Sequence, residues 1–170
     1  GDVEDKQVSL YSDYVKFDDV NSGSWYAGYV GYCANAEYIK GRTATTFDPN
    51  GKVTGYEALA MILRAVGYDK NGEFTGTGWQ VQVASTAKKL GITNNVTEGT
   101  LNNAATREVV AELLFRSILV PQVEYTLAFG YQSYGQDSIG YDTFGLVCVE
   151  GIVTGNEYAL LSKTNTPGAA

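Results

Sequence analysis

The stretch "TGYEALAMILRAVGY", residues 54–68, has a near-echo in "TREVVAELLFRSIL", residues 106–119. The two align when Thr54 is placed on Thr106. Each then carries apolar residues at positions i, i+3, i+4 and i+7, the spacing of one helix face. These positions are Leu59, Ile62, Leu63 and Val66 in the first stretch, and Ala111, Leu114, Phe115 and Ile118 in the second. We therefore expect two equivalent amphipathic helices.

The ends of both stretches support helices. Threonine is a favoured N-cap because its hydroxyl accepts a bond from a backbone N–H that has no partner within the helix. Glu57, three residues after Thr54, predicts a capping box at the first helix. Arg64 and Arg116 coincide in the alignment near the two C-termini, where a cation suits the helix dipole.

The similarity extends upstream of both helices. Trp25 and Trp79 each begin an apolar face with offsets of 4, 8 and 11 residues. The further members are Tyr29, Cys33 and Ala36 in the first face, and Val83, Ala87 and Leu90 in the second. The polar loops "KGRTATTFDPNGKV" and "TNNVTEGTLNNAA" follow, with residues typical of turns. The pattern predicts a mainly α fold with helices near 24–38, 54–66, 79–90 and 106–119. Repeated units of this kind bury their apolar faces by packing on one another.

The first copy resembles the S-layer homology domain family. It contains "FDDV" (17–20), then Trp25, then "GRTATTFDPNGKVTGYEALAMILRA" (41–65). The family pattern is F-x-D-V, an aromatic residue, a Gly-rich turn, F-x-P and a helix that starts with threonine and arginine. The second copy matches less fully. It keeps Phe74, Trp79, Gly91, Ile92, Thr106, Arg107 and Arg116, whereas "TLNNAA" replaces the F-x-P step.

The resemblance implies a secreted module on the surface of a Gram-positive bacterium. It implies three helix-loop-helix motifs in a pseudo-threefold arrangement, whose grooves bind pyruvylated secondary cell-wall polysaccharide non-covalently. By motif position, the ligand-binding candidates are Asp19, Trp25, Trp79 and Arg107. In the first copy Gly55 stands where the family has its arginine.

Each candidate also has an interpretation that involves no ligand. The two tryptophans suit stacking on sugar rings, but they equally suit core packing at a helix start. Asp19 either contacts ligand or caps the helix that begins near Trp25. Arg107 either grips a carboxylate or is an exposed first-turn arginine.

The motif boundaries suggest four regions. Residues 1–16 are an N-terminal extension, and we expect the first dozen to be frayed. Residues 17–68 and 69–120 are the first and second motifs. Residues 121–170 are an incomplete third motif or the start of a β-rich segment, with 127–141 as an irregular loop. Within it, 141–161 suits either a helix or strands. A missing third motif leaves an apolar side that 141–161, residues 8–17 or a second chain must cover. We favour 141–161, which in both cases offers Phe144, Leu146, Val147, Ile152 and Val153.

Composition restricts the function further. The 170 residues are 44% hydrophobic and carry a net charge of −7, which suits a globular domain and disfavours nucleic acid or an anionic membrane as partner. The chain has no histidine, the commonest general base and zinc ligand. We predict no catalytic residue, metal or cofactor. Cys33 and Cys148 are either a disulfide or two free thiols.

The sequence therefore predicts a non-catalytic cell-surface module that binds cell-wall polysaccharide. The alternative is a structural or protein-interaction scaffold that has lost wall binding, with copies of itself or other surface proteins as partners.

Overall fold

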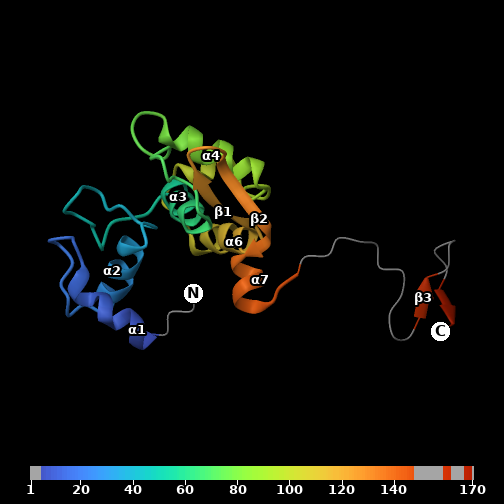
Figure 1. Ribbon diagram of the computed structural model, residues 1–170, viewed down its shortest axis with the longest axis horizontal. Coiled ribbons are helices and arrows are strands. Elements are labelled where there is room, and N and C mark those ends of the chain that lie inside the picture. Colours follow the sequence, from blue (N-terminus) through green and yellow to red (C-terminus); the bar gives the residue numbers. More distant parts are fainter. Residues whose placement is uncertain (1–4, 148–158, 162–166, 170) are drawn as a thin grey trace.

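The computed structural model describes residues 5–147, 159–161 and 167–169. Within them the chain is rich in helix and has two small antiparallel sheets (Figure 1). In order, the elements are α1 (Asp5–Ser9), the 3-10 helix η1 (Leu10–Tyr14), α2 (Ala27–Asn35), α3 (Gly55–Val66), α4 (Trp79–Lys89), α5 (Glu98–Leu101), α6 (Arg107–Ser117), β1 (Pro121–Thr126), β2 (Gly130–Ser138), α7 (Ile139–Phe144), β3 (Ala159–Leu161) and β4 (Pro167–Ala169). The two sheets pair β1 with β2 and β3 with β4. None of the described helices has the length and apolar character of a membrane span.

The four predicted helices are confirmed as α2, α3, α4 and α6. Thr54 caps α3 in the predicted way. Its hydroxyl accepts a bond from the Glu57 amide, while the Glu57 carboxylate accepts one from the Thr54 amide. Gly67 ends the same helix with a φ of 113°, a conformation that glycine adopts without steric cost. Thr106 caps α6 through the Val109 amide.

Helix α3 lies at the centre of the main core and contacts α4, α5, α6 and β1 (Figure 1). Leu59, Leu63 and Val66 of its predicted stripe are fully buried. They form one cluster with residues of the neighbouring elements, including Val83, Ala87, Ile92, Leu101, Leu113 and Val120. Burying each such Leu, Ile or Val side chain contributes about 1.5–3 kcal/mol. This central helix therefore joins the first motif to the second.

The predicted stripe on α6 is wrong. Leu114 and Phe115 are 51% and 70% exposed, whereas Leu113 and Ser117 are buried. Successive helix residues are turned by about 100°, so a shift of one position selects a different face. Helix α3 is covered on several sides, but α6 packs on α3 with a narrower face. The repeat in sequence is therefore not matched by equal surroundings.

The predicted apolar face on α2 is also wrong, because Trp25 is 85% exposed and Tyr29 is exposed too. The buried face consists of small residues, including Gly28 and Gly31. A Cβ atom at Gly28 or Gly31 would collide with the main chain of Val8 or Tyr11, respectively. These glycines let α1 and η1 pack closely on α2. The expectation that the first dozen residues are frayed is therefore wrong for residues 5–12.

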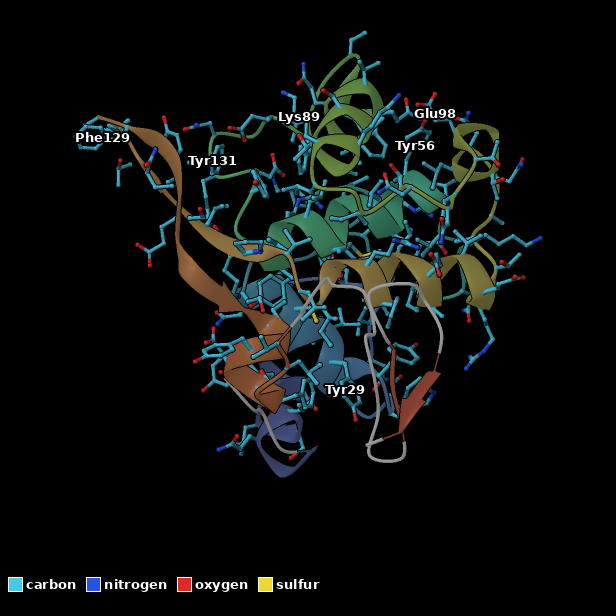
Figure 2. All side chains as sticks on the ribbon, turned by 90° about the vertical axis from the view of Figure 1, so that its right-hand side faces the viewer. Tyr29, Tyr56, Lys89, Glu98, Phe129 and Tyr131 are labelled. Atoms are coloured by element: carbon cyan, nitrogen blue, oxygen red, sulfur yellow. The ribbon has the colours of Figure 1, made fainter. Side chains whose placement is uncertain are left out.

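Residues 121–138 form a β-hairpin, so the prediction of an irregular loop at 127–141 is wrong. Strand β1 pairs antiparallel with β2, with Tyr125 opposite Tyr131 and Thr126 opposite Gly130. Tyrosine and valine favour strands, which outweighs the glycines that suggested a loop. The hairpin passes over the end of α3, where the carbonyl of Val123 lies against Gly67. Figure 2 shows Phe129 at the tip of this hairpin, away from the helices.

Strand β1 contacts α3, a neighbour that the sequence did not predict for this segment. Phe144, Leu146 and Val147 are exposed, so these three do not close the core. Ile152, Val153 and Cys148 lie outside the described residues. Two helix-loop-helix units are present in the described part of the chain, and the pseudo-threefold arrangement stays a prediction.

Candidate functional site

A cavity of about 460 Å³ opens where the two motifs meet. Three segments line it: the loop from Ile39 to Val53, one face of α3, and the stretch from Phe74 to Trp79 at the start of α4. Among the lining residues are the cations and larger apolar side chains Lys40, Arg42, Phe47, Met61, Arg64 and Trp79. The pocket therefore combines three cations and two carboxylates, Asp48 and Glu57, with an apolar and aromatic wall.

Asp19 holds the loop wall of this pocket in place. Its two carboxylate oxygens accept bonds from the backbone amides of Phe47 at 2.8 Å and Asp48 at 2.7 Å. The bond from the Phe47 amide is the main reason that the pKa of Asp19 lies below its usual value. Phe17 also stacks on Phe47, with ring centroids 5.4 Å apart. The F-x-D-V step therefore shapes the loop that carries Phe47.

Arg42 connects the loop to the start of α3. Its guanidinium forms an ion pair with Glu57 and donates a bond of 2.8 Å to the carbonyl of Lys52. The second carboxylate oxygen of Glu57 accepts the Thr54 amide at 2.7 Å. The capping box of α3 thus extends into the pocket wall and fixes the position of Arg42.

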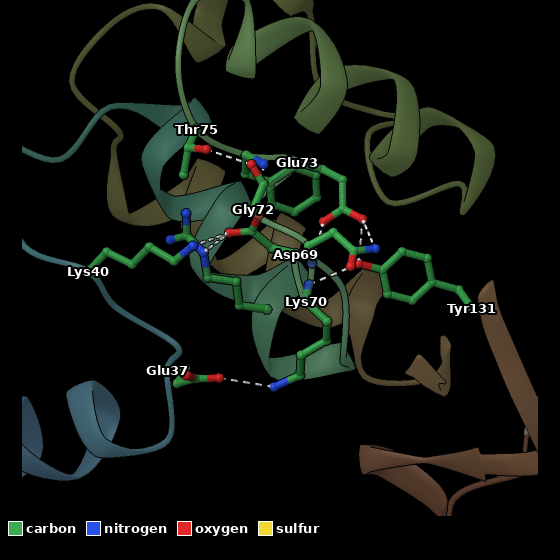
Figure 3. A network of polar contacts seen from close by, with 11 residues as sticks. Glu37, Lys40, Asp69, Lys70, Gly72, Glu73, Thr75 and Tyr131 are labelled. Atoms are coloured by element: carbon green, nitrogen blue, oxygen red, sulfur yellow. Dashed lines mark hydrogen bonds and ion pairs between the residues drawn. The ribbon is translucent and has the colours of Figure 1, made fainter. Parts of the chain in front are cut away.

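A buried carboxylate organises the other two cations. Lys40 Nζ and Arg64 Nε donate to the same oxygen, Oδ2 of Asp69, at 2.9 and 2.7 Å, and the Phe74 amide donates to Oδ1 at 2.7 Å (Figure 3). The Asp69 side chain is 1% exposed. Burial acts to raise the pKa of Asp69, but these three bonds outweigh it, so the pKa lies below its usual value. One negative charge is shared between two cations, which leaves a net positive charge at this wall.

This arrangement suits a ligand with both a carboxylate and a sugar ring. Charge-assisted bonds from Lys and Arg are the stronger class of hydrogen bond and select anionic groups. An aromatic face such as that of Trp79 packs on the apolar side of a pyranose ring. Most small-molecule pockets have this character, an apolar lining with a few convergent polar groups.

Of the four residues predicted from the motif, the structure places Trp79 in the pocket wall. Asp19 supports the wall through backbone amides and is not itself among the lining residues. Trp25 lies on the surface, where its ring meets the edge of Tyr26. Arg107 is the exposed first residue of α6 and is likewise outside the lining. The structure therefore brings Trp79 together with cations, and it does not bring the four predicted residues into one site.

Lys40 and Arg42 were not predicted as pocket residues, and Arg64 was predicted only as a cation at the helix C-terminus and a match to the family pattern. A usable signal was the "KGR" of the loop, which places two cations two residues apart just before the turn. Asp69 had no local signal, because its role depends on contacts with Lys40, which is 29 residues away in the chain.

Position 55, where the family has its arginine, is too crowded in this structure for any side chain larger than that of glycine. A Cβ atom at this position would lie 2.7 Å from the Cα of Leu101 in α5. The Gly55 amide also donates to the carbonyl of Asn103 at 3.2 Å, and the Ala105 amide donates to the carbonyl of Val53 at 2.8 Å. The two motif loops meet here too closely for a side chain at position 55.

Comparison with known proteins bears on the identity of the chain. The family model described as "S-layer homology domain" matches residues 16–59. Over 112 residues, 64% of the chain, the sequence is 36% identical to a middle cell wall protein of Brevibacillus brevis, of which it covers 10%. It is 31% identical over 110 residues, again 64% of the chain, to a surface layer protein of Brevibacillus choshinensis, of which it also covers 10%.

A third relative is an endoglucanase of Bacillus sp., 30% identical over 159 residues, which is 89% of the chain and 16% of that protein. The chain thus spans a small fraction of the curated relatives that it matches. No solved structure matches it. Residues 16–59 therefore belong to the S-layer homology domain family, in a chain that lies at the bacterial cell surface.

Proposed function

We propose that this chain is a non-catalytic module that anchors a larger surface protein by binding an anionic secondary cell-wall polysaccharide in the 460 Å³ pocket. The observation that carries the proposal is the convergence of Lys40, Arg64 and Trp79 on one cavity between the motifs. The names of the relatives, a middle cell wall protein and a surface layer protein, support the anchoring role.

The placement of the cations in the pocket, rather than the charge balance of the chain, supports an anionic ligand. The chain carries a net charge of −7, so its overall field repels a polyanion. Lys40 and Arg64 share a single carboxylate, and Arg42 is held nearby. The guanidinium of Arg64 uses only Nε within the described part of the chain, which leaves its two terminal nitrogens for a ligand. A pyruvate ketal on a wall sugar presents a carboxylate of the required kind.

The acidic residues of the pocket support binding without catalysis. Of the two that line it, Asp48 and Glu57, the second is held by Arg42 and by the amide of Thr54. Glycoside hydrolysis needs a pair of carboxyl groups across the scissile bond, one of them protonated. Both carboxylate oxygens of Glu57 are engaged by Arg42 and Thr54, so this group is not free to act with Asp48 across a scissile bond. We assign the activity of the endoglucanase relative to the part of that protein outside the matched region.

Sedimentation with wall sacculi of Brevibacillus brevis tests the proposal. The protein should be retained by untreated sacculi and released once mild acid has removed their secondary polymer. Lys40→Ala should weaken retention by about tenfold, since it removes one charge-assisted contact. Lys89→Ala is the matched control, because Lys89 is exposed and does not line the pocket. The proposal is contradicted if acid-treated sacculi retain the protein as well as untreated sacculi do. It is also contradicted if Lys40→Ala and Lys89→Ala are retained equally.

The second candidate function is the scaffold role, in which wall binding has been lost. It is favoured by the exposed apolar face of α6, formed by Leu114 and Phe115. Sedimentation velocity of the wild type and of Phe115→Ser distinguishes the two. Self-association that Phe115→Ser abolishes, together with no retention by sacculi, supports the scaffold.

A further inference from the structure

The hairpin and the pocket are connected by the loop of residues 69–75, "DKNGEFT". Two carboxylates of this loop have separate roles. Asp69 binds the pocket cations Lys40 and Arg64, whereas Glu73 binds Tyr131 of strand β2 (Figure 3). The loop therefore bridges an element outside the matched motif to the wall of the binding site.

Tyr131 holds the loop at two points. Its hydroxyl donates to Glu73 Oε1 at 2.8 Å and accepts the backbone amide of Lys70 at 2.9 Å. Burial and the neighbouring Glu73 raise the pKa of Tyr131 to about 12, so the hydroxyl keeps its proton for this bond. Glu73 is held in turn by the amide and the side chain of Asn71, each at 3.2 Å. The phenol is thus anchored to the residue that follows Asp69.

The loop needs such support because its backbone is unusual. Asp69 has a φ of 69° and Gly72 one of 73°. A non-glycine residue in the left-handed region is disfavoured and persists where surrounding contacts hold it. The Asp69 carboxylate is held by its bonds from Phe74, Lys40 and Arg64. The next residue, Lys70, is held by the bond from its amide to Tyr131. Loss of the Tyr131 bonds should loosen the loop that carries Asp69.

We propose that Tyr131 is a positioning residue for the pocket, which keeps Asp69, and through it Lys40 and Arg64, in the geometry that binds ligand. This inference rests on the proposed function only for its effect on affinity. The coupling from Tyr131 to Arg64 is a property of the free protein. By thermodynamic linkage, a ligand on Lys40 and Arg64 stabilises the contact between loop and hairpin in return.

A merely structural role for Tyr131 makes a different prediction. Its ring packs on Tyr68 and Tyr125, with centroids 5.0 and 5.1 Å apart. Tyr131→Phe keeps these ring contacts and removes only the hydroxyl. Tyr125→Phe is the matched control, because the Tyr125 hydroxyl has no hydrogen bond within the described residues. An effect through ring packing alone should leave both variants like the wild type.

NMR of the intact chain measures the coupling without a ligand. Exchange rates of the Lys70 and Phe74 amides and of the Arg64 Nε–H report on the two sides of the loop, since each donates one of the bonds named above. We expect Tyr131→Phe to speed all three by about tenfold, the factor for a bond to a charged group, and Tyr125→Phe to change none. Affinity for polymer extracted from Brevibacillus brevis walls should fall for Tyr131→Phe alone.

Faster exchange at Lys70 with unchanged Phe74 and Arg64 overturns the proposal, because the hydroxyl then acts only locally. Faster exchange at all three with unchanged affinity for the polymer also overturns it. If wild-type protein binds no polymer, the proposed function fails, and the exchange rates still decide whether the loop is coupled. Should Tyr131→Phe not fold, Glu73→Gln, which removes the charge from the same bond but keeps the hydroxyl beside Lys70, takes its place, with faster exchange expected at Phe74 and Arg64.

Discussion

Arg64 and Asp69 form a nearly buried ion pair at the end of α3, with Arg64 Nε 2.7 Å from Asp69 Oδ2. Breaking a buried pair by removing one charge leaves the other uncompensated, which typically costs about 3–5 kcal/mol. Lys40 also pairs with Asp69, but its side chain is partly exposed, so water solvates part of its charge when the carboxylate is removed. We expect Asp69→Asn to lower the free energy of unfolding by about 3 kcal/mol. Urea denaturation measures this, and a loss below about 1 kcal/mol would show that the pair contributes little.

The same carboxylate predicts the pH dependence of stability. The pKa of Asp69 is lower in the folded protein than in the unfolded chain, where it is about 3.9. Its contribution is therefore complete above about pH 4 and is lost as pH falls through the lower folded-state pKa. Glu73, whose pKa is also lowered, adds a contribution of the same sign.

Urea denaturation between pH 7 and pH 2 checks this sign. Wild-type stability should fall steeply below about pH 4, and the Asp69→Asn variant should fall less steeply over the same range. Parallel curves for the two proteins would mean that Asp69 titrates alike in the folded and unfolded chain.

Gly55 gives a prediction about the contact between the two motifs. Gly55→Ala places a Cβ 2.7 Å from the Leu101 Cα and should cost about 1–3 kcal/mol, the usual penalty of overpacking. Gly99→Ala in α5 is the control, because a Cβ there meets no atom within 4 Å. Alanine is the better helix former, so this control should be neutral or slightly stabilising. Thermal unfolding compares them, and equal melting temperatures would contradict the close contact at Gly55.

The face of α6 gives a further prediction. Leu113 is fully buried, so Leu113→Ala should cost about 2–5 kcal/mol. Phe115 is mostly exposed, and Phe115→Ser should change stability by less than about 0.5 kcal/mol. The two residues are two positions apart, so chemical denaturation of this pair determines which face of α6 is inside. A larger loss of stability for Phe115→Ser than for Leu113→Ala would mean that the face of α6 predicted from the repeat is the buried one.

The helices were predictable because their evidence is local. The stripe of α3, the capping box at Thr54 and Glu57 and the turn residues of the loops all lie within a few positions of one another. The inner face of α6 was not predictable in this way. Leu114 has the right spacing, but whether it is buried depends on which neighbours cover the helix. The hairpin was missed because its glycines and tyrosines suit a loop as well as a twisted two-stranded ribbon.

The pocket was predictable only in part. Trp79 was found because the motif marks its position. Lys40 and Arg64 belong to the site because Asp69, distant in sequence from Lys40, brings their side chains together. Contacts of this kind have no periodicity and no local spacing. The same holds for Tyr131, which meets Glu73 from 58 residues away.

The fluorescence of Trp79 during titration with purified wall polymer tests the central claim most directly. The chain has two tryptophans, so Trp25→Phe leaves Trp79 as the single reporter, at the pocket wall. We predict a saturable change in emission with native polymer, and none with polymer whose carboxylate groups have been removed or blocked. Binding that leaves Trp79 emission unchanged, or that persists equally with the neutral polymer, would contradict an anionic glycan site between the two motifs.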